Sequence, residues 1–130
     1  MGFDIHGIKP VHIEPAYTGE DSQVLYEYEQ ASGIYFRNNC WWWRPLWGFI
    51  CQHCTDILTE DDMYSGSFND GHKINATKAK KIAIKLEALN LDGTLDQYEE
   101  NYIDKTYPFN KDNVLNFAEF AKNSGGFQIY

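Results

Sequence analysis

The stretch that decides the fold is residues 33–47, GIYFRNNCWWWRPLW. Its first part, Ile34–Phe36, follows a glycine and consists of residues that favour extended backbone, which predicts a short strand. Pro45 suits the first turn of a helix, because the N–H that proline lacks would have no partner there. Apolar residues then recur every three or four positions, which predicts a helix over about 45–58. A strand is therefore expected to be followed closely by an amphipathic helix.

The rest of the chain predicts further helices and a small sheet. The expected helices cover residues 77–90, 94–106 and 112–123, with Asp112 as the cap of the last, and the expected strands cover residues 3–8 and 127–130. Polar residues with prolines and glycines predict loops over Lys9–Gln23 and Thr59–Lys73. We therefore expect an α+β fold rich in helix, with about four helices and a small two- or three-stranded sheet, in a single domain over residues 1–130.

The composition limits the classes of function. The chain has 130 residues, 43% of them hydrophobic, which is typical of one globular domain. Its formal net charge of −8 disfavours general binding to DNA or RNA, because such a surface repels phosphates. No apolar run is long enough to cross a membrane, and the N-terminus does not resemble a secretory signal. A cytoplasmic protein without a membrane partner is therefore expected, and the sequence leaves its oligomeric state open.

Tryptophan and arginine are concentrated in one segment of this acidic chain. All four tryptophans lie within Trp41–Trp47, and both arginines, Arg37 and Arg44, lie close by. No Asp or Glu occurs from Gln30 to Thr55, where the composition predicts about four. Any acidic partner of an arginine must therefore come from elsewhere in the chain. The candidates are Asp4, Glu60 and Asp70.

These residue types suit a planar or anionic ligand. Arginine offers a rigid fork of donors for carboxylate or phosphate, and tryptophan offers a flat face for stacking. The amides of Asn38 and Asn39 can recognise hydrogen-bonding edges. The alternative is that the tryptophans pack in the core and the arginines stack on them. Three consecutive tryptophans cannot all face one way, so at least one is expected to be buried.

The loop Ser67–Lys73 is a second candidate for anion binding. Asn69-Asp70-Gly71 is a strong turn signal, and His72 and Lys73 follow it directly. Such a turn can present backbone N–H groups to an anion, to which the two side chains add donors or charge. The alternative is an ordinary surface turn before a helix.

A zinc site is disfavoured, although the spacing of Cys51 and Cys54 resembles one. Cys40 and His72 could complete four ligands, but a structural zinc site normally has two paired ligand sets and this chain has one pair. Cys51 and Cys54 also lie on or beside the apolar stripe of the expected helix, where free cysteine packs as a small hydrophobe. We expect all three cysteines to be free, Cys51 and Cys54 to be largely buried, and neither a metal nor a cofactor to be bound.

Four motifs of the chain belong together: the G-x-Y-F-R-N-N-x-W-W-W-R-P-L-W motif over residues 33–47, the opening residues 1–7, the loop Asn69–His72, and residues 117–129, which contain S-G-G-F. In these motifs the chain resembles a family of small, mostly uncharacterised proteins of bacteriophages and bacteria. The resemblance implies a small phage-type accessory protein that acts in the bacterial cytoplasm. Such proteins often inhibit host defence, for example by sequestering a nucleotide-derived immune signal, and the link to this chain is by analogy.

Three hypotheses from different classes follow. The first is a non-catalytic binder of a small anionic, nucleotide-like ligand, in which Arg37, Arg44 and His72 converge on one pocket. The residues assigned to this hypothesis are Arg37, Asn38, Asn39, Trp41, Trp42, Trp43, Arg44, Trp47, Asn69, His72 and Lys73. The second is a protein-interaction module that inhibits a host enzyme, with both arginines stacked internally and an exposed apolar or acidic patch. The third is a small hydrolase or phosphodiesterase that uses His72 or His6 with a carboxylate such as Asp70 or Asp4. Catalysis is the least favoured, and no residue is assigned to it.

Overall fold

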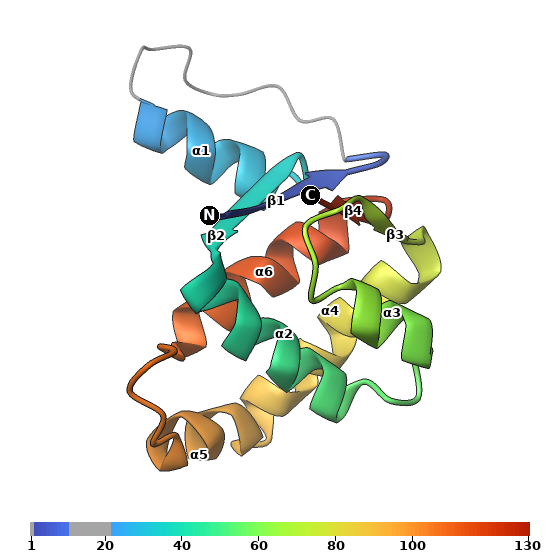
Figure 1. The fold of residues 1–130 in the computed structure, drawn as a ribbon. Helices are drawn as coiled ribbons and strands as arrows, with labels where there is room; N and C mark the ends of the chain where they lie inside the picture. Colours follow the sequence, from blue (N-terminus) through green and yellow to red (C-terminus); the bar gives the residue numbers. More distant parts are fainter. Residues whose placement is uncertain (1, 11–21) are drawn as a thin grey trace.

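Four short strands form one antiparallel sheet in the part of the chain that the structure describes. The structure is a computed structural model and describes residues 2–10 and 22–130. The strands are β1 (Gly2–Gly7), β2 (Tyr35–Asn39), β3 (His72–Ile74) and β4 (Phe127–Ile129), in the spatial order β2-β1-β4-β3. Along β1, Phe3 and Ile5 are buried while His6 is exposed, because successive side chains of a strand point to opposite faces. The first and last strands are paired, so the two ends of the chain meet in the sheet (Figure 1).

Six helices accompany the sheet in the described residues. They are α1 (Ser22–Ala31), α2 (Cys40–His53), α3 (Glu60–Ser65), α4 (Ala76–Leu91), α5 (Thr94–Asn101) and α6 (Lys111–Asn123). Figure 1 shows α6 running beneath the sheet beside α4, with α5 at the end of the molecule farthest from the sheet. None of the described helices is both long enough and apolar enough to span a lipid bilayer.

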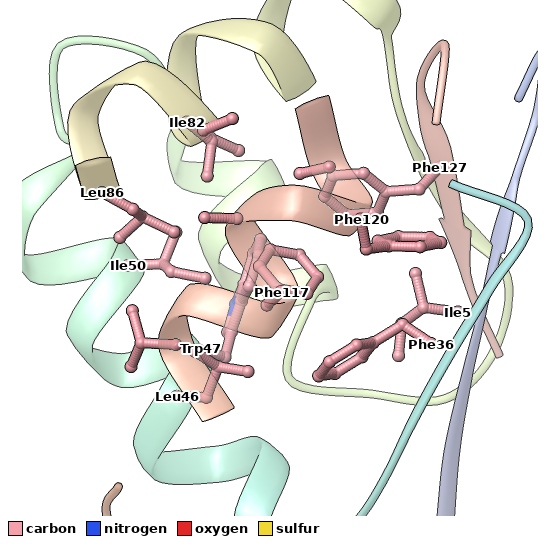
Figure 2. Packing of buried hydrophobic residues seen from close by; sticks show 14 of the residues in the cluster. Ile5, Phe36, Leu46, Trp47, Ile50, Ile82, Leu86, Phe117, Phe120 and Phe127 are labelled. Atoms are coloured by element: carbon pink, nitrogen blue, oxygen red, sulfur yellow. The ribbon is translucent and has the colours of Figure 1, made fainter. Parts of the chain in front are cut away.

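One hydrophobic core joins the sheet to α2, α4 and α6. Phe117 of α6 contacts Phe36 of β2 and Phe127 of β4, with ring centroids 5.2 and 5.4 Å apart. Figure 2 shows the α6 aromatic rings between the sheet residues and the apolar side chains of α2 and α4, which include Ile50 and Ile82. The helix expected over residues 112–123 is therefore confirmed, and its apolar face lies at the centre of the core.

Helix α2 begins five residues earlier than the sequence predicts. Asn39 caps it, since its side-chain oxygen accepts a hydrogen bond of 3.1 Å from the backbone N–H of Trp42. Pro45 consequently lies inside the helix rather than in its first turn, and it removes the hydrogen bond to the Trp41 carbonyl. The cap and the burial of the following apolar face outweigh a loss that typically costs about 3 kcal/mol. Strand β2 thus passes into α2 without a loop.

The predicted α+β class is confirmed, whereas the number of elements is larger than expected. Helix α1 was not predicted, and the loop expected over Lys9–Gln23 lies mostly outside the described residues. The loop expected over residues 59–73 contains α3 and the first two residues of β3. Helix α5 ends at Asn101 instead of residue 106, and α6 is capped by Asn110 instead of Asp112. These corrections share one cause: short elements are stabilised by caps and tertiary contacts more than by hydrophobic periodicity.

Candidate functional site

The three consecutive tryptophans of α2 occupy three different environments. Trp43 is completely buried and stacks between Phe3 and Trp47, with ring centroids 5.6 and 5.5 Å away. Trp42 is half-buried, whereas Trp41 is 49% exposed and packs against Tyr107. The prediction that at least one tryptophan of the triplet is buried is confirmed, because each step along a helix rotates the side chain by about 100°.

The buried indoles connect α2 to the segment around α3. The indole N–H of Trp43 donates to the Gly66 carbonyl at 2.9 Å, and that of Trp47 donates to the Met63 carbonyl at 3.0 Å. Gly66 lies so close to Trp47 that an added Cβ atom would be 2.2 Å from the indole ring. The two tryptophans therefore form a rigid structural wall and use their single polar groups internally.

One side of this wall lines a pocket that contains Arg44. The Arg44 pocket has a volume of about 500 Å³ and is lined by Trp43, Arg44, Trp47, Gly48, Cys51, Met63, Ser67 and Phe68. Arg44 is exposed, and no carboxylate of the described residues lies within ion-pairing distance of its guanidinium. Phe68 is 45% exposed, so its ring is accessible at this pocket. The arrangement offers one unpaired cation beside apolar and aromatic surface.

Arg37 lies in a different pocket and has an acidic partner. The Arg37 pocket has a volume of about 530 Å³ and is lined by Tyr26, Tyr35, Arg37, Asn38, Asn39 and Trp42. The guanidinium Nε of Arg37 lies 3.6 Å from a carboxylate oxygen of Asp4, its cross-strand neighbour. The same oxygen accepts a hydrogen bond from the Tyr35 hydroxyl, and burial together with this carboxylate raises the pKa of Tyr35 to about 12. Asp4 was among the partners considered from the sequence.

The two asparagines of this segment have structural partners. The Asn38 amide exchanges two hydrogen bonds, of 3.1 and 2.9 Å, with the Asn113 amide of α6. Asn39 uses its side-chain oxygen to cap α2. The Tyr26 hydroxyl also bonds to both backbone groups of Arg37. Most polar groups of the Arg37 pocket are thus already paired within the protein.

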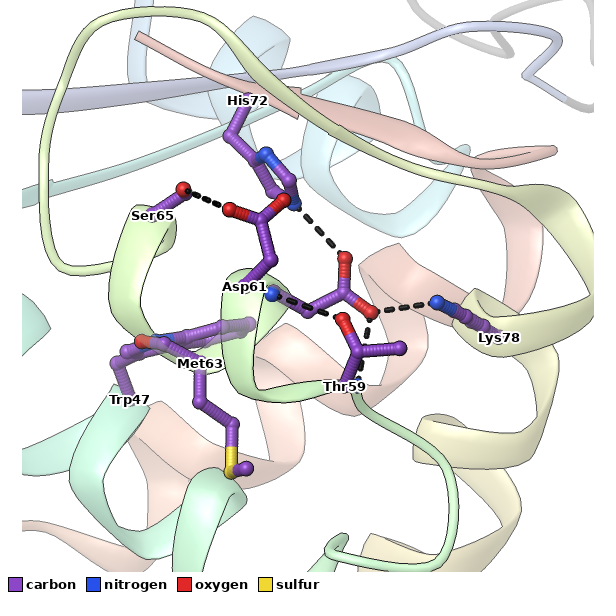
Figure 3. Close-up of polar contacts among 8 residues, drawn as sticks. Trp47, Thr59, Asp61, Met63, Ser65, His72 and Lys78 are labelled. Atoms are coloured by element: carbon purple, nitrogen blue, oxygen red, sulfur yellow. Dashed lines mark hydrogen bonds and ion pairs between the residues drawn. The ribbon is translucent and has the colours of Figure 1, made fainter.

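His72 belongs to a polar cluster around a buried carboxylate. We call Thr59, Asp62, His72 and Lys78 the Asp62 cluster. The carboxylate of Asp62, only 8% exposed, accepts from His72 Nε2 at 2.9 Å and from Lys78 Nζ, and it also closes the α3 capping box with Thr59. Figure 3 shows these three partners, Thr59, His72 and Lys78, with dashed lines that converge on one carboxylate. Burial by itself raises the pKa of Asp62, but the hydrogen bonds from Lys78, Thr59 and His72 outweigh it and hold that pKa well below its usual range.

The remaining residues of the expected anion loop point to separate partners. The Asn69 amide donates to the Gly2 carbonyl at 3.2 Å and so holds the loop against β1. Lys73 is exposed on β3, and no acid of the described residues pairs with it. The loop therefore connects α3 to β3. Neither arginine joins the turn, His72 and Lys73 in a common anion-binding site.

The predicted convergence of Arg37, Arg44 and His72 is not what the structure shows. Arg37 and Arg44 line different pockets, because one lies on strand β2 and the other on helix α2, and His72 lines neither of these pockets. The histidines also differ from the hydrolase hypothesis: His72 bonds to Asp62 instead of Asp70, and the ring of His6 packs against Tyr35 and Tyr130. The sequence-predicted site is thus divided into two pockets and one structural cluster.

The three cysteines are free. Cys54 is completely buried, as predicted, whereas Cys51 is half-buried and lines the Arg44 pocket. Burial raises the pKa of Cys51 to about 11 and, together with nearby charges, that of Cys54 to about 12, so both thiols stay protonated at neutral pH. Within the described residues, no group of three or more His, Cys, Asp or Glu side chains is placed to hold a metal ion.

Five residues of the Arg44 pocket were not assigned as site residues from the sequence: Gly48, Cys51, Met63, Ser67 and Phe68, of which the last two lie in the candidate loop Ser67–Lys73. Phe68 carries a usable signal, since it is an isolated aromatic residue in the polar stretch Ser65–Gly71. Comparison of the chain with protein-family models, curated proteins and solved structures finds no match. The family resemblance described above therefore stays a prediction, and the site is interpreted from its own geometry.

Proposed function

We propose that the protein is a non-catalytic binder of a small anionic, nucleotide-like ligand and that the Arg44 pocket is its binding site. The observation that carries this proposal is the unpaired guanidinium of Arg44 at a pocket with aromatic surface. Holding a long cationic side chain in place without a partner costs up to about 2 kcal/mol of side-chain entropy, and a bound anion offsets that cost.

The pocket has groups that can contact both the phosphate and the base of a nucleotide. The Arg44 guanidinium can donate two parallel hydrogen bonds to a phosphate, and the exposed ring of Phe68 can stack against a base. A volume of about 500 Å³ is within the range typical of small-molecule sites. The absence of acidic residues from Gln30 to Thr55 also keeps negative charge off the whole of α2.

The Arg37 pocket is the weaker candidate for an anion. The carboxylate of Asp4 already neutralises Arg37 and would repel a phosphate placed beside it. The amides of Asn38 and Asn39 are committed to Asn113 and to the α2 cap. Arg37 is therefore a matched control for Arg44: it is exposed, nearby and of the same chemistry, but paired.

The biological setting that we propose is that of a phage accessory protein in the bacterial cytoplasm. Sequestration of a nucleotide-derived immune signal requires binding without turnover. His72 pairs with the carboxylate of Asp62 in the Asp62 cluster and does not line the Arg44 pocket. The proposal therefore assigns no catalytic step to the site.

Calorimetry with a small panel of nucleotides tests this proposal. The probes are AMP, cyclic AMP, cyclic di-AMP and cyclic di-GMP, with adenosine as the uncharged control. At least one anionic probe should bind, and Arg44→Gln should weaken it about tenfold or more, because a charge-assisted hydrogen bond is lost. Arg37→Gln should leave the affinity unchanged, and the melting temperature of Arg44→Gln should stay near that of the wild type. Binding by none of the probes, or equal effects of the two variants, would contradict the proposal.

A protein-interaction module is the second candidate, and one observation favours it. Tyr64 is 70% exposed and packs edge-to-face against Phe68, so two accessible aromatic rings lie together at the end of α3. Exposed aromatic pairs of this kind are common anchors of protein interfaces. If a host protein docks there, Tyr64→Ala should weaken its capture by the tagged protein, whereas the nucleotide affinity should not change.

A further inference from the structure

Another cavity lies between α4 and α6, and it shares no lining residue with the Arg44 and Arg37 pockets. It has a volume of about 580 Å³, and its lining combines three lysines, Lys9, Lys80 and Lys122, with the apolar side chains of Ala83 and Ile84. We call it the lysine groove. Neither the sequence hypotheses nor the proposed function uses any of these residues.

The three lysines come from distant parts of the chain, and none of them has an acidic partner among the described residues. Lys9 follows β1, Lys80 lies on α4 and Lys122 lies in the last turn of α6, and none forms an ion pair within the described residues. Three other lysines, Lys78, Lys85 and Lys111, do pair with aspartates. Three lysines that have no acidic partner among the described residues thus line one cavity of a protein with a net charge of −8, where their mutual repulsion favours a bound anion.

Close backbone packing places these lysines together. Gly125 and Gly126 have φ angles of +65° and +93°, which L side chains rarely adopt. A Cβ atom on Gly125 would lie 2.2 Å from the Lys9 carbonyl oxygen, and one on Gly126 would lie 3.0 Å from the Ala76 nitrogen. The glycine pair therefore brings Lys9 and the end of α6 against the first turn of α4. The backbone positions of the residues at the cationic end of the groove are therefore fixed by the fold, and not only by the conformations of flexible side chains.

The wall formed by α4 continues as an apolar surface. Ala76, Lys80, Ala83, Ile84 and Glu87 all line the cavity, and their spacing places them on one face of the helix. Ile84 is 66% exposed, which leaves its side chain available to an apolar partner. Glu87 lies seven positions after Lys80, which corresponds to about 10 Å along the helix axis. The groove is therefore cationic at one end, apolar along its middle, and bears a carboxylate towards the other end.

We propose that the lysine groove binds a small amphipathic anion, namely a linear alkyl chain that ends in one carboxylate. The lysines hold the carboxylate, and Ala83 and Ile84 cover the chain. Glu87 disfavours a ligand with a second negative charge at its far end, which distinguishes a monocarboxylate from a dicarboxylate. A simple anion would leave the apolar wall uncovered, and an uncharged chain would leave the lysines unpaired.

Titration of the ¹⁵N-labelled protein with octanoate, followed by NMR, tests the proposal. Octanoate should shift amide signals of α4 and of the Gly125–Gly126 turn, whereas octanol, acetate and suberate, the dicarboxylate of similar length, should bind more weakly. Lys80→Gln and Lys122→Gln should each weaken octanoate binding about fivefold. Lys81→Gln is the matched control, since Lys81 is an exposed lysine on α4 that does not line the groove, and it should change nothing. Glu87→Gln should remove the preference for octanoate over suberate.

Several results would overturn the proposal. If octanol binds as well as octanoate, the lysines have no role, and if acetate binds as well, the apolar wall has none. The proposal is also contradicted if Lys80→Gln and Lys122→Gln bind octanoate as Lys81→Gln does, or if octanoate shifts no amide signal of the groove. Preserved amide spectra of the unliganded variants show that any loss of binding does not come from unfolding.

Discussion

Replacement of Lys78 by methionine tests whether the Asp62 cluster stabilises the fold. The ammonium of Lys78 pairs with an Asp62 side chain that is 8% exposed. Lys85→Met is the matched control, because Lys85 lies on the same helix but pairs with Asp56, whose side chain is 64% exposed. Methionine retains most of the aliphatic part of lysine, so both variants remove a charge with little loss of packing.

The expected magnitudes differ because the two carboxylates differ in burial. A hydrogen bond to a charged, poorly solvated group contributes about 1.5–3 kcal/mol, and its loss leaves Asp62 short of a partner. An exposed ion pair contributes about 0.2–1 kcal/mol. Lys78→Met should therefore lower the free energy of unfolding by about 1.5–3 kcal/mol and Lys85→Met by less than about 1 kcal/mol. Urea denaturation at neutral pH, monitored by tryptophan fluorescence, measures both values.

The pH dependence provides a separate check. The pKa of Asp62 in the folded protein lies below its ordinary value of 3.8, so the carboxylate stabilises the fold above about pH 4. That contribution decreases as the pH falls below 3.8, where the carboxyl group of the unfolded chain takes up a proton, and it is lost as the pH falls through the lower pKa of the folded state. The stability difference between wild type and Lys78→Met should thus be largest near neutral pH and should shrink below 3.8. Equal destabilisation by the two lysine variants, or a difference that does not change with pH, would refute the assigned role of Asp62.

Two further pairs of variants test how α2 and α6 are held. Gly66→Ala should lower the free energy of unfolding by about 1–3 kcal/mol, because the new methyl group overlaps Trp47, whereas Gly48→Ala should be neutral or stabilising, since a Cβ there meets no atom within 4 Å. Thermal denaturation of both variants measures this, and equal melting temperatures would count against the packing argument. Asn110→Ala should cost about 1 kcal/mol, because its side chain caps α6, and Asp112→Ala should cost less. A larger loss for Asp112→Ala in urea denaturation would restore Asp112 as the cap.

Long periodic segments could be predicted from the sequence. The apolar faces of α4 and α6 repeat over three or more turns, and both helices begin and end within one residue of the predicted positions. Shorter elements were missed because their signals are local caps. The Thr59–Asp62 capping box determines the start of α3, yet α3 has only six residues and no apolar repeat to reveal it.

The sequence by itself determined that an acid-free segment holds both arginines and all the tryptophans, because composition and helical spacing are properties of neighbouring residues. Only the tertiary structure decided which arginine has a partner. The register of β1 against β2 places Asp4 opposite Arg37, and no described carboxylate comes close to Arg44. The tertiary structure also places Phe68 at the Arg44 pocket, although Phe68 lies 24 positions after Arg44 in the sequence. Such pairings depend on the packing of distant segments, and the hydrophobic pattern of either segment alone does not contain that information.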